Sequence, residues 1–352
     1  MMDENSDVLA GRAQRARASL AAESLRHAVP AQPSGQGRAG SRRVLQVVTG
    51  LAVVAIVVGF LVAGTWRTRS VVVPNVMTTV SAGSHPVAVV TDGSTVFVAD
   101  AGPGAVTAID AKKLSASWSI RDATRPTALA LGPDALWVLD AGSSHLLKLD
   151  PADGHVIATS QTSLRPLGLA VTGSTVWVLS GGNNTLDRYD AGTVTQNGSV
   201  DVPPGSVSVS AGGGYVWVTA PTQVVRVALD ANRGSGVLPI PLADRPVAVA
   251  ATASSTWVAL RGGALVDLDG ADPSRVLARV ATDATPSAVT ALDDGSAVVA
   301  TSAGSLSRIT AEGRSSLLPA VGATVASLSS SGSLLVAVSP VTALLYATEV
   351  SP

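Results

Sequence analysis

The chain has 352 residues and a net charge of −1, with 14% charged residues, 3% aromatic residues and no cysteine. The absence of cysteine excludes disulfides, thiolate zinc sites, a cysteine nucleophile and a lipoprotein anchor. From residue 75 onward, 21 acidic residues outnumber 15 basic ones, so we do not expect nucleic acid as a partner.

Residues 1–43 are expected to form a cytoplasmic tail, because they are polar and carry seven arginines against four acidic residues. Ser6 is placed to cap a helix over the Ala-, Leu- and Arg-rich residues 6–28, but the apolar face of that helix is thin. Residues 30–40 have the Pro, Gly and Ser content of a flexible linker. The tail is therefore predicted to be partly helical or disordered.

Residues 44–66 contain no charged side chain and are mostly apolar. A helix of this length measures roughly 34 Å, which is enough to cross a hydrocarbon core of about 30 Å. Arginines are more frequent before this stretch than after it, which places the tail in the cytoplasm and the rest of the chain outside. We predict a single-pass protein of the cell membrane with an uncleaved signal anchor. A cleaved signal peptide with a small-residue site at Ala63 and Gly64 is the alternative, but the segment is long for one.

After a tether at residues 67–74, one pattern recurs about every forty residues. A bulky aromatic residue lies in each of five short β-forming runs, and an aliphatic residue takes its place in two more; we call these seven residues the ladder: Phe97, Trp137, Trp177, Trp217, Trp257, Val298 and Leu335. The copies start at Pro86, Pro126, Pro166, Gly205, Pro246, Pro286 and Thr324. Alternating apolar residues between Gly, Asp and Pro turns are typical of hairpin strands. Together with the period, they predict propeller blades.

Seven copies predict an all-β fold, a seven-bladed β-propeller of four-stranded antiparallel blades over residues 75–352, after one transmembrane helix and the cytoplasmic tail. The last copy has no room for a fourth strand. Residues 76–82 have the form of an outer strand, so we predict that they close the last blade and remove the open sheet edge. The ladder is predicted to pack between blades.

The repeat resembles that of the YVTN and NHL-type bacterial β-propellers, in which an Arg-Pro start is followed by an aromatic-Val strand, a small residue and Asp or Asn. The matching stretches are Arg125-Pro126 with Trp137 to Asp140, Arg165-Pro166 with Trp177 to Ser180, and Arg245-Pro246 with Trp257-Val258. The resemblance covers about residues 75–352. It implies the propeller fold and is compatible with binding modules, sensor domains of membrane kinases, and lactonase-like or lyase-like enzymes.

Loops that enter the inner strands should meet the loops between the second and third strands on one face, around the channel mouth. The residues there that could bind a ligand are His85, Arg125, Arg165, Arg245, Asp100, Asp140, His145 and Arg261. Guanidinium groups bind carboxylates and phosphates bidentately, so the face is a candidate site for a protein or an anionic ligand. The structural alternative is that the three Arg-Pro arginines pair with Asp100 and Asp140 to lock the blades together.

Signals for catalysis are few. No serine-hydrolase, zinc-protease or P-loop motif is present. Asp267, Asp269 and Asp272 could bind calcium, but Asp-Gly turns are ordinary hairpin chemistry. We therefore expect no catalytic residue, metal or cofactor, and an extracytoplasmic module that binds or scaffolds a ligand or a protein. The alternative is an extracytoplasmic lactonase-like or lyase-like enzyme at the channel mouth.

Overall fold

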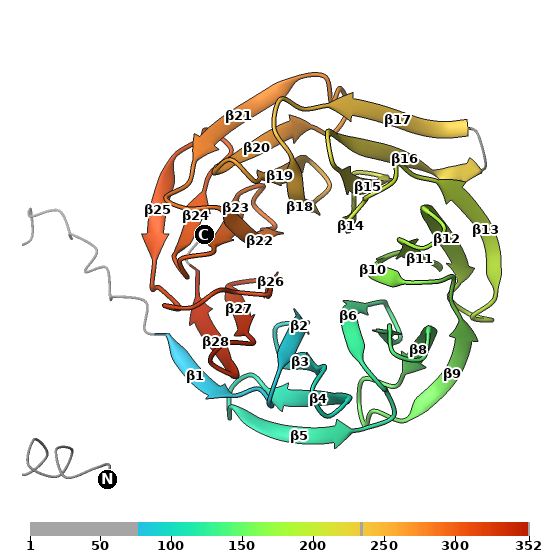
Figure 1. The fold of residues 1–352 in the computed structure, drawn as a ribbon. Coiled ribbons are helices and arrows are strands. Elements are labelled where there is room, and N and C mark those ends of the chain that lie inside the picture. Colours follow the sequence, from blue (N-terminus) through green and yellow to red (C-terminus); the bar gives the residue numbers. More distant parts are fainter. Residues whose placement is uncertain (1–76, 233–234, 351–352) are drawn as a thin grey trace, which may run out of the picture. The chain divides into compact units, whose positions relative to one another are not determined.

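The computed structural model describes residues 77–232 and 235–350. Over these ranges the chain forms strands β1 to β28, arranged in seven four-stranded antiparallel sheets that stand around a common axis (Figure 1). The predicted all-β seven-bladed propeller is confirmed. The predicted tail (1–43), membrane span (44–66) and tether (67–74) lie outside the described residues. Within the described ranges, no helix is long and apolar enough to cross a membrane.

Six blades are each made of four consecutive strands, which follow one another from the axis outward. Blade 1 consists of β2 (Pro86–Thr91), β3 (Thr95–Asp100), β4 (Ala105–Asp110) and β5 (Ser115–Ile120), and blade 2 of β6 (Pro126–Leu131), β7 (Leu136–Asp140), β8 (His145–Leu149) and β9 (Val156–Gln161). Blade 3 consists of β10 (Pro166–Thr172), β11 (Thr175–Ser180), β12 (Thr185–Asp190) and β13 (Gln196–Asp201), and blade 4 of β14 (Ser208–Gly212), β15 (Tyr215–Ala220), β16 (Gln223–Asn232) and β17 (Ser235–Pro241). Blade 5 consists of β18 (Pro246–Ala251), β19 (Ser255–Leu260), β20 (Ala264–Asp269) and β21 (Val276–Ala281), and blade 6 of β22 (Pro286–Ala291), β23 (Ala297–Thr301), β24 (Leu306–Ile309) and β25 (Ser315–Leu318).

Blade 7 combines strands from the two ends of the propeller. Its first three strands are β26 (Ser327–Ser331), β27 (Leu334–Ser339) and β28 (Leu344–Glu349), and its outer strand is β1 (Thr78–Ser81). In the antiparallel pairing of β1 with β28, Thr79 lies opposite Tyr346 and Val80 opposite Leu345. This pairing gives the last blade the same four strands as the others and closes the ring.

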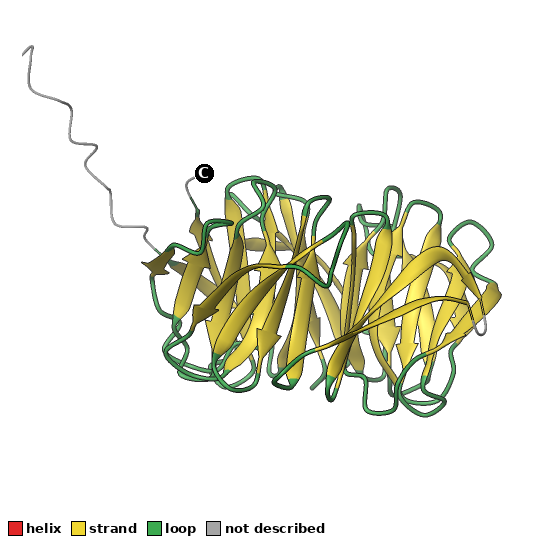
Figure 2. Cartoon of the chain, turned by 90° about the horizontal axis from the view of Figure 1, so that it is seen from above, coloured by secondary structure: helices red, strands yellow, loops and turns green. Residues whose placement is uncertain are grey.

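The loops gather at the two ends of the strands (Figure 2). We call one end the top face. It carries the connections from each outer strand to the next inner strand and the hairpins between the second and third strands. The bottom face carries the remaining hairpins, between the first and second and between the third and fourth strands. These definitions follow from the antiparallel strand order of every blade.

The ladder residues lie on the second strands and are at most 1% exposed. The ladder residues of blades 1 to 6 pack into hydrophobic clusters shared with the following blade, whereas Leu335 of blade 7 packs against blade 6, and its neighbour Val336 faces blade 1 instead. Trp177 of blade 3, for example, shares a cluster with Val216 and Val218 of blade 4. In blade 6, Val298 occupies the equivalent place and packs with Leu335 of blade 7. The ladder therefore forms the cores between neighbouring blades.

The predicted starts agree with the inner strands of five blades, which begin at their prolines. In blades 4 and 7, β14 and β26 begin at Ser208 and Ser327, after the predicted starts at Gly205 and Thr324. Neither start has a proline to fix φ for strand entry. Before β14, the chain first makes a turn in which the Ser206 N–H donates to the Pro203 carbonyl (3.3 Å). The delay is thus a local effect of the missing proline.

Cations on three third strands connect neighbouring blades at the bottom face. We call them the clasp cations: Lys148, Arg188 and Arg226, which lie directly opposite Trp137, Trp177 and Trp217 in the strand register. Each donates to a main-chain carbonyl near the end of the third strand of the following blade. Lys148 Nζ bonds the Ala191 oxygen at 2.8 Å, and Arg226 Nη1 bonds the Gly270 oxygen at 2.9 Å. The clasp cations thus join blades 2 to 5 through the main chain.

Candidate functional site

The residues just before four of the inner strands share one main-chain geometry. The carbonyl oxygens of His85, Arg125, Arg165 and Arg245 each accept a hydrogen bond from the residue that follows the second strand, at 2.8 to 3.1 Å. This bond fixes the main chain of each residue, while all four side chains are exposed. The repeat therefore presents one imidazole and three guanidinium groups to solvent on the top face.

Asp100 and Asp140 are buried at the ends of the second strands of blades 1 and 2. The Asp140 carboxylate accepts hydrogen bonds from the N–H groups of Thr124 (2.8 Å) and Arg125 (2.7 Å) and from the Ser143 hydroxyl (2.6 Å). Burial tends to raise the pKa of Asp140, but hydrogen bonds from Ser143 and from main-chain N–H groups outweigh it and lower the pKa. Asp100 accepts from the His85 N–H in the same way (2.8 Å). Both carboxylates therefore anchor the loops that enter the inner strands.

The guanidinium groups of Arg125, Arg165 and Arg245 have no carboxylate within ion-pairing distance in the part of the chain that the structure describes. The structural alternative, in which these arginines pair with Asp100 and Asp140, is therefore wrong. Those carboxylates bind main-chain N–H groups instead, and the clasp cations, which sequence analysis missed, connect the blades. The feature that could have identified the clasp cations is a basic residue on the third strand, directly opposite a ladder tryptophan.

In blade 5, the carboxylate that anchors the entry loop comes from the loop itself and not from the end of the second strand. Leu260 stands at its strand end in place of an aspartate, and Asp244 of the entry loop supplies the carboxylate. Asp244 accepts from the N–H groups of Arg245 (2.7 Å) and Gly262 (2.6 Å). The Arg261 N–H in turn donates to the Arg245 carbonyl (2.8 Å), and both arginine side chains are exposed. Two guanidinium-bearing residues are thus joined through their main chains on the top face of this blade.

In the part of the chain that the structure describes, neither histidine of the top face has an acidic partner within ion-pairing distance. His145 Nδ1 lies 2.9 Å from the Ser143 carbonyl oxygen, and the side chain is half-buried. Among the ion pairs of the described residues, the only one with a histidine joins His155 and Asp153 on the bottom face. A carboxylate-oriented imidazole, as general acid–base catalysis commonly uses, is therefore not formed at His85 or His145.

Three large apolar side chains are also exposed on the top face: Leu164 (67%), Val207 (43%) and Val341 (72%). Sequence analysis did not single them out, although Leu164 directly precedes an Arg-Pro step. Arg165 has φ of 55°, in the left-handed region that costs a residue with a Cβ roughly 1–2 kcal/mol. Single exposed apolar side chains are common on protein surfaces, so these three do not by themselves mark an interaction site. The top face thus offers both guanidinium and apolar groups to a partner.

The three aspartates that were weighed as calcium ligands do not form a group of ligand atoms within 4.8 Å of one another. Asp267 is fully buried, Asp269 accepts from the Ala271 N–H of its own turn (2.9 Å), and Asp272 accepts from the Ser274 hydroxyl (2.6 Å). Elsewhere on the bottom face, ligand atoms of Asp150, Asp153 and His155 lie within 4.8 Å of one another. Asp153 and His155 are exposed and already bond each other at 2.7 Å.

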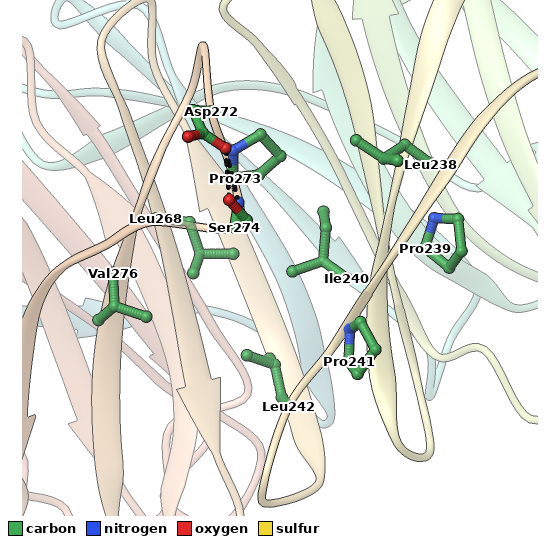
Figure 3. Close-up of a pocket in the computed structure, with 10 residues that line it drawn as sticks. All are labelled: Leu238, Pro239, Ile240, Pro241, Leu242, Leu268, Asp272, Pro273, Ser274 and Val276. Carbon is green, nitrogen blue, oxygen red and sulfur yellow. Dashed lines mark hydrogen bonds between the residues drawn. The ribbon is translucent and has the colours of Figure 1, made fainter.

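An apolar groove of about 430 Å³ lies on the side of the ring between blades 4 and 5. Side chains of β17 form one wall, and Leu268, Val276 and the turn at Asp272 form the other (Figure 3). Pro239 and Pro241 of this outer strand lack N–H groups, which blocks the addition of another strand there. The groove can therefore receive side chains but does not extend the sheet.

The sequence matches no protein-family model and no curated protein. Among solved structures, the chain is similar to virginiamycin B lyase from Staphylococcus aureus (13% identity, TM-score 0.66, covering 79% of this chain and 100% of that chain). It is also similar to hydrazine synthase from Kuenenia stuttgartiensis (16% identity, TM-score 0.67, covering 76% of this chain and 96% of that chain). A third similar structure is BamB from Moraxella catarrhalis (14% identity, TM-score 0.52, covering 75% of this chain and 84% of that chain). At these identities the likeness shows the propeller fold alone. The resemblance to YVTN and NHL-type repeats stays a prediction.

Proposed function

We propose that the chain is a membrane-anchored extracytoplasmic propeller that binds an acidic partner protein through its top face. The observation that carries this proposal is the set of exposed guanidinium groups at Arg125, Arg165, Arg245 and Arg261. Within the described ranges, no carboxylate of the chain pairs with them. An exposed arginine donates bidentately to a carboxylate, so these side chains fit Asp or Glu on a partner.

Three carboxylates of the same face do not compete for these arginines. Asp100, Asp140 and Asp244 use their oxygens to accept main-chain N–H groups, which leaves the guanidinium donors available. Recognition by this face therefore relies on short-range hydrogen bonds rather than on a large net charge. Leu164, which directly precedes Arg165, adds exposed apolar area next to one of the arginines, as in the mixed surfaces of protein interfaces.

Binding can be separated from folding at Arg165. Its left-handed main chain suits glycine, so Arg165→Gly should leave the melting temperature unchanged or raise it slightly. Combined with Arg125→Gln and Arg245→Gln, it should weaken binding of the full-length protein to a Glu-rich peptide by about tenfold or more. The matched control is Arg275→Gln with Arg314→Gln and Arg279→Gln, which removes three exposed cations that lie away from the top-face loops. Equal losses from both sets, or none from the first, would contradict the proposal.

The membrane topology can be tested directly because the chain has no cysteine. Ala303→Cys introduces a single thiol on an exposed top-face hairpin, and Ser6→Cys introduces one in the predicted tail. In intact cells, a membrane-impermeant maleimide should label the first variant and spare the second until the cells are lysed. Labelling of both, or recovery of the protein in the soluble fraction, would overturn the anchored arrangement.

A further inference from the structure

A cleft of about 360 Å³ opens on the bottom face between blades 2 and 3. Its lining includes Gly132 and Asp134 from the turn after β6, Trp137 of β7 and Lys148 of β8; blade 3 contributes the turns at Gly173 and Gly192. This volume is at the small end of the range for small-molecule sites, roughly 300–1,000 Å³. The cleft lies on the face opposite the exposed arginines and is independent of the function proposed for them.

The indole N–H of Trp137 has no hydrogen-bond partner among the described residues, although the side chain is only 1% exposed. The other ladder tryptophans all have one. Trp177 Nε1 donates to the Thr172 hydroxyl (2.8 Å), Trp217 Nε1 to the Gly212 carbonyl (3.3 Å) and Trp257 Nε1 to the Gly295 carbonyl (2.9 Å). Trp137 Nε1 is not among the solvent-inaccessible atoms of the described residues that lack a partner, so the cleft reaches this N–H and leaves it available to an external acceptor.

The difference between blades 2 and 3 comes from one residue. Thr172, which accepts from Trp177, stands five residues before that tryptophan, and Gly132 stands five residues before Trp137. Glycine has no hydroxyl to offer. A Cβ built on Gly132 would lie 3.0 Å from Trp137 Nε1, so a side chain there would occupy the place of an acceptor. The indole N–H is open to the cleft because Gly132 offers no hydroxyl and because, unlike Gly212 in blade 4, its carbonyl does not accept from the tryptophan among the described hydrogen bonds.

Lys148 adds a cation at the same cleft. Its Nζ lies 5.6 Å from the centroid of the Trp137 ring and uses one donor on the Ala191 carbonyl (2.8 Å). An ammonium group has three donors, so two remain for a ligand. The nearby Asp190 carboxylate is occupied by the N–H groups of Gly192 (3.0 Å) and Thr193 (2.8 Å). Asp134 is exposed and lines the cleft with no partner among the described residues.

We propose that this cleft binds a small zwitterionic ligand of amino-acid or dipeptide size. The ligand carboxylate accepts from Trp137 Nε1–H and the Lys148 ammonium, and its ammonium group faces the Asp134 carboxylate. A cation and a neutral N–H together match the two oxygens of one carboxylate. A simple monocarboxylate fits less well, because it leaves Asp134 without a partner and is repelled by it.

The first test measures hydrogen exchange of the indole N–H groups in the full-length chain by nuclear magnetic resonance, with the signals assigned from single Trp→Phe variants. The Trp137 signal should exchange much faster than those of Trp177 and Trp257, which are buried and hydrogen-bonded. Exchange of Trp137 at the rate of Trp177 would show that its N–H is already satisfied within the protein, and would overturn the proposal.

The second test titrates the same sample with the free amino acids, with dipeptides, and with acetate and methylamine as single-charge controls. An amino acid or a dipeptide should shift the Trp137 indole signal at millimolar concentration or below, and acetate and methylamine should need at least about tenfold more. The two zwitterion series distinguish a free amino acid from a peptide terminus. No shift with either series would overturn the proposal.

Two variants locate the binding, and a third provides a control. Gly132→Thr supplies the acceptor that blade 3 has, and Lys148→Met removes the ammonium while it keeps the length of the side chain. Each should weaken the response about tenfold or more. Lys113→Met, on an exposed turn of blade 1, should leave it unchanged. If Gly132→Thr does not fold, the ligand response of Lys148→Met alone tests the assignment. Unchanged affinity in the folded variants would place the binding elsewhere and refute the assignment.

Discussion

Arg226 Nη1 donates a hydrogen bond to the Gly270 carbonyl oxygen at 2.9 Å, across the boundary between blades 4 and 5. The same nitrogen bonds the Ala271 oxygen at 3.1 Å, and the guanidinium carbon lies 4.2 Å from the centroid of the Tyr215 ring. One side chain thus joins two blades through the main chain of a turn. Such a link does not depend on which side chains the turn carries.

Arg226→Met should destabilise the protein by about 1–3 kcal/mol, because it removes two hydrogen bonds from a charged donor and a cation–π contact. The control is Arg279→Met, which removes an exposed cation from the outer strand of blade 5. Urea denaturation of both variants measures the difference in the free energy of unfolding. Similar stability of the two variants would show that the clasp contributes nothing.

Two third strands carry a buried aspartate, and the two carboxylates differ in their partners. Asp187 accepts hydrogen bonds from the hydroxyls of Ser180 (3.2 Å) and Ser199 (2.8 Å). Asp267 accepts one from the Thr256 N–H (3.2 Å), and its Oδ2 has no partner in the described structure. Burial, and to a smaller extent the charge of Asp269, raise the pKa of Asp267 to about 6.

The raised pKa of Asp267 predicts a loss of stability as the pH increases. Between about pH 4, the pKa of an unfolded aspartate, and about pH 6, the native state holds a proton that the unfolded state has lost. The free energy of unfolding therefore falls across this window. Asp267→Asn removes the effect and should stabilise the protein by about 1–3 kcal/mol at neutral pH, but not below about pH 4.

Asp187→Asn is the matched control for that substitution. It disturbs a carboxylate that already accepts two hydroxyls, so it should destabilise the protein by about 1 kcal/mol. Denaturant unfolding at neutral and acidic pH gives both values. A stabilising effect of Asp187→Asn, or a pH-independent effect of Asp267→Asn, would contradict the difference inferred from their hydrogen bonds.

The number and order of the blades could be predicted because the ladder repeats at a nearly constant interval. In blades 1 to 6 each ladder residue is buried against the next blade, so its spacing records the length of one blade; in blade 7 the predicted position was one residue early, because Val336 and not Leu335 faces blade 1. Strand entry was predicted correctly where proline fixes φ, as at Pro126, and was three residues early at Gly205, where it does not. Sequence spacing therefore reports strand positions only where a local constraint sets them.

The partners of charged side chains could not be predicted in the same way. Arg125 and Asp140 are close in the repeat, and their charges suggest a pair, but the Asp140 carboxylate is turned towards the Arg125 main-chain N–H. A carboxylate buried at a strand end must satisfy several lone pairs, and main-chain donors are fixed there. The clasp cations were overlooked because the number of residues between a ladder tryptophan and its clasp cation depends on the length of the hairpin loop. Lys148 follows a long loop, and Arg226 follows a short one.

Truncation of a ladder residue should reduce stability according to the volume removed. Trp177→Ala deletes a fully buried indole and should cost about 3–5 kcal/mol, whereas Val298→Ala should cost about 1–2 kcal/mol. Equilibrium denaturation, with the slope checked for unchanged cooperativity, measures both. A loss below about 1 kcal/mol for Trp177→Ala would mean that the blade interface repacks around the cavity.

Asp140→Asn should destabilise the protein by about 2–3 kcal/mol at neutral pH, because an amide cannot accept all of the hydrogen bonds that the carboxylate receives from Thr124, Arg125 and Ser143. The lowered pKa gives this effect a pH dependence. The stabilisation by the ionised Asp140 is fully present above the unfolded pKa of about 4 and is lost as the pH falls through the lower folded pKa. The difference in the free energy of unfolding between wild type and variant should therefore shrink in acid.

Asp134→Asn, at an exposed carboxylate of the same blade, is the control and should change stability by less than about 0.5 kcal/mol. If Asp140→Asn matched that control at neutral pH, the carboxylate would not be the anchor of the loop that carries Arg125.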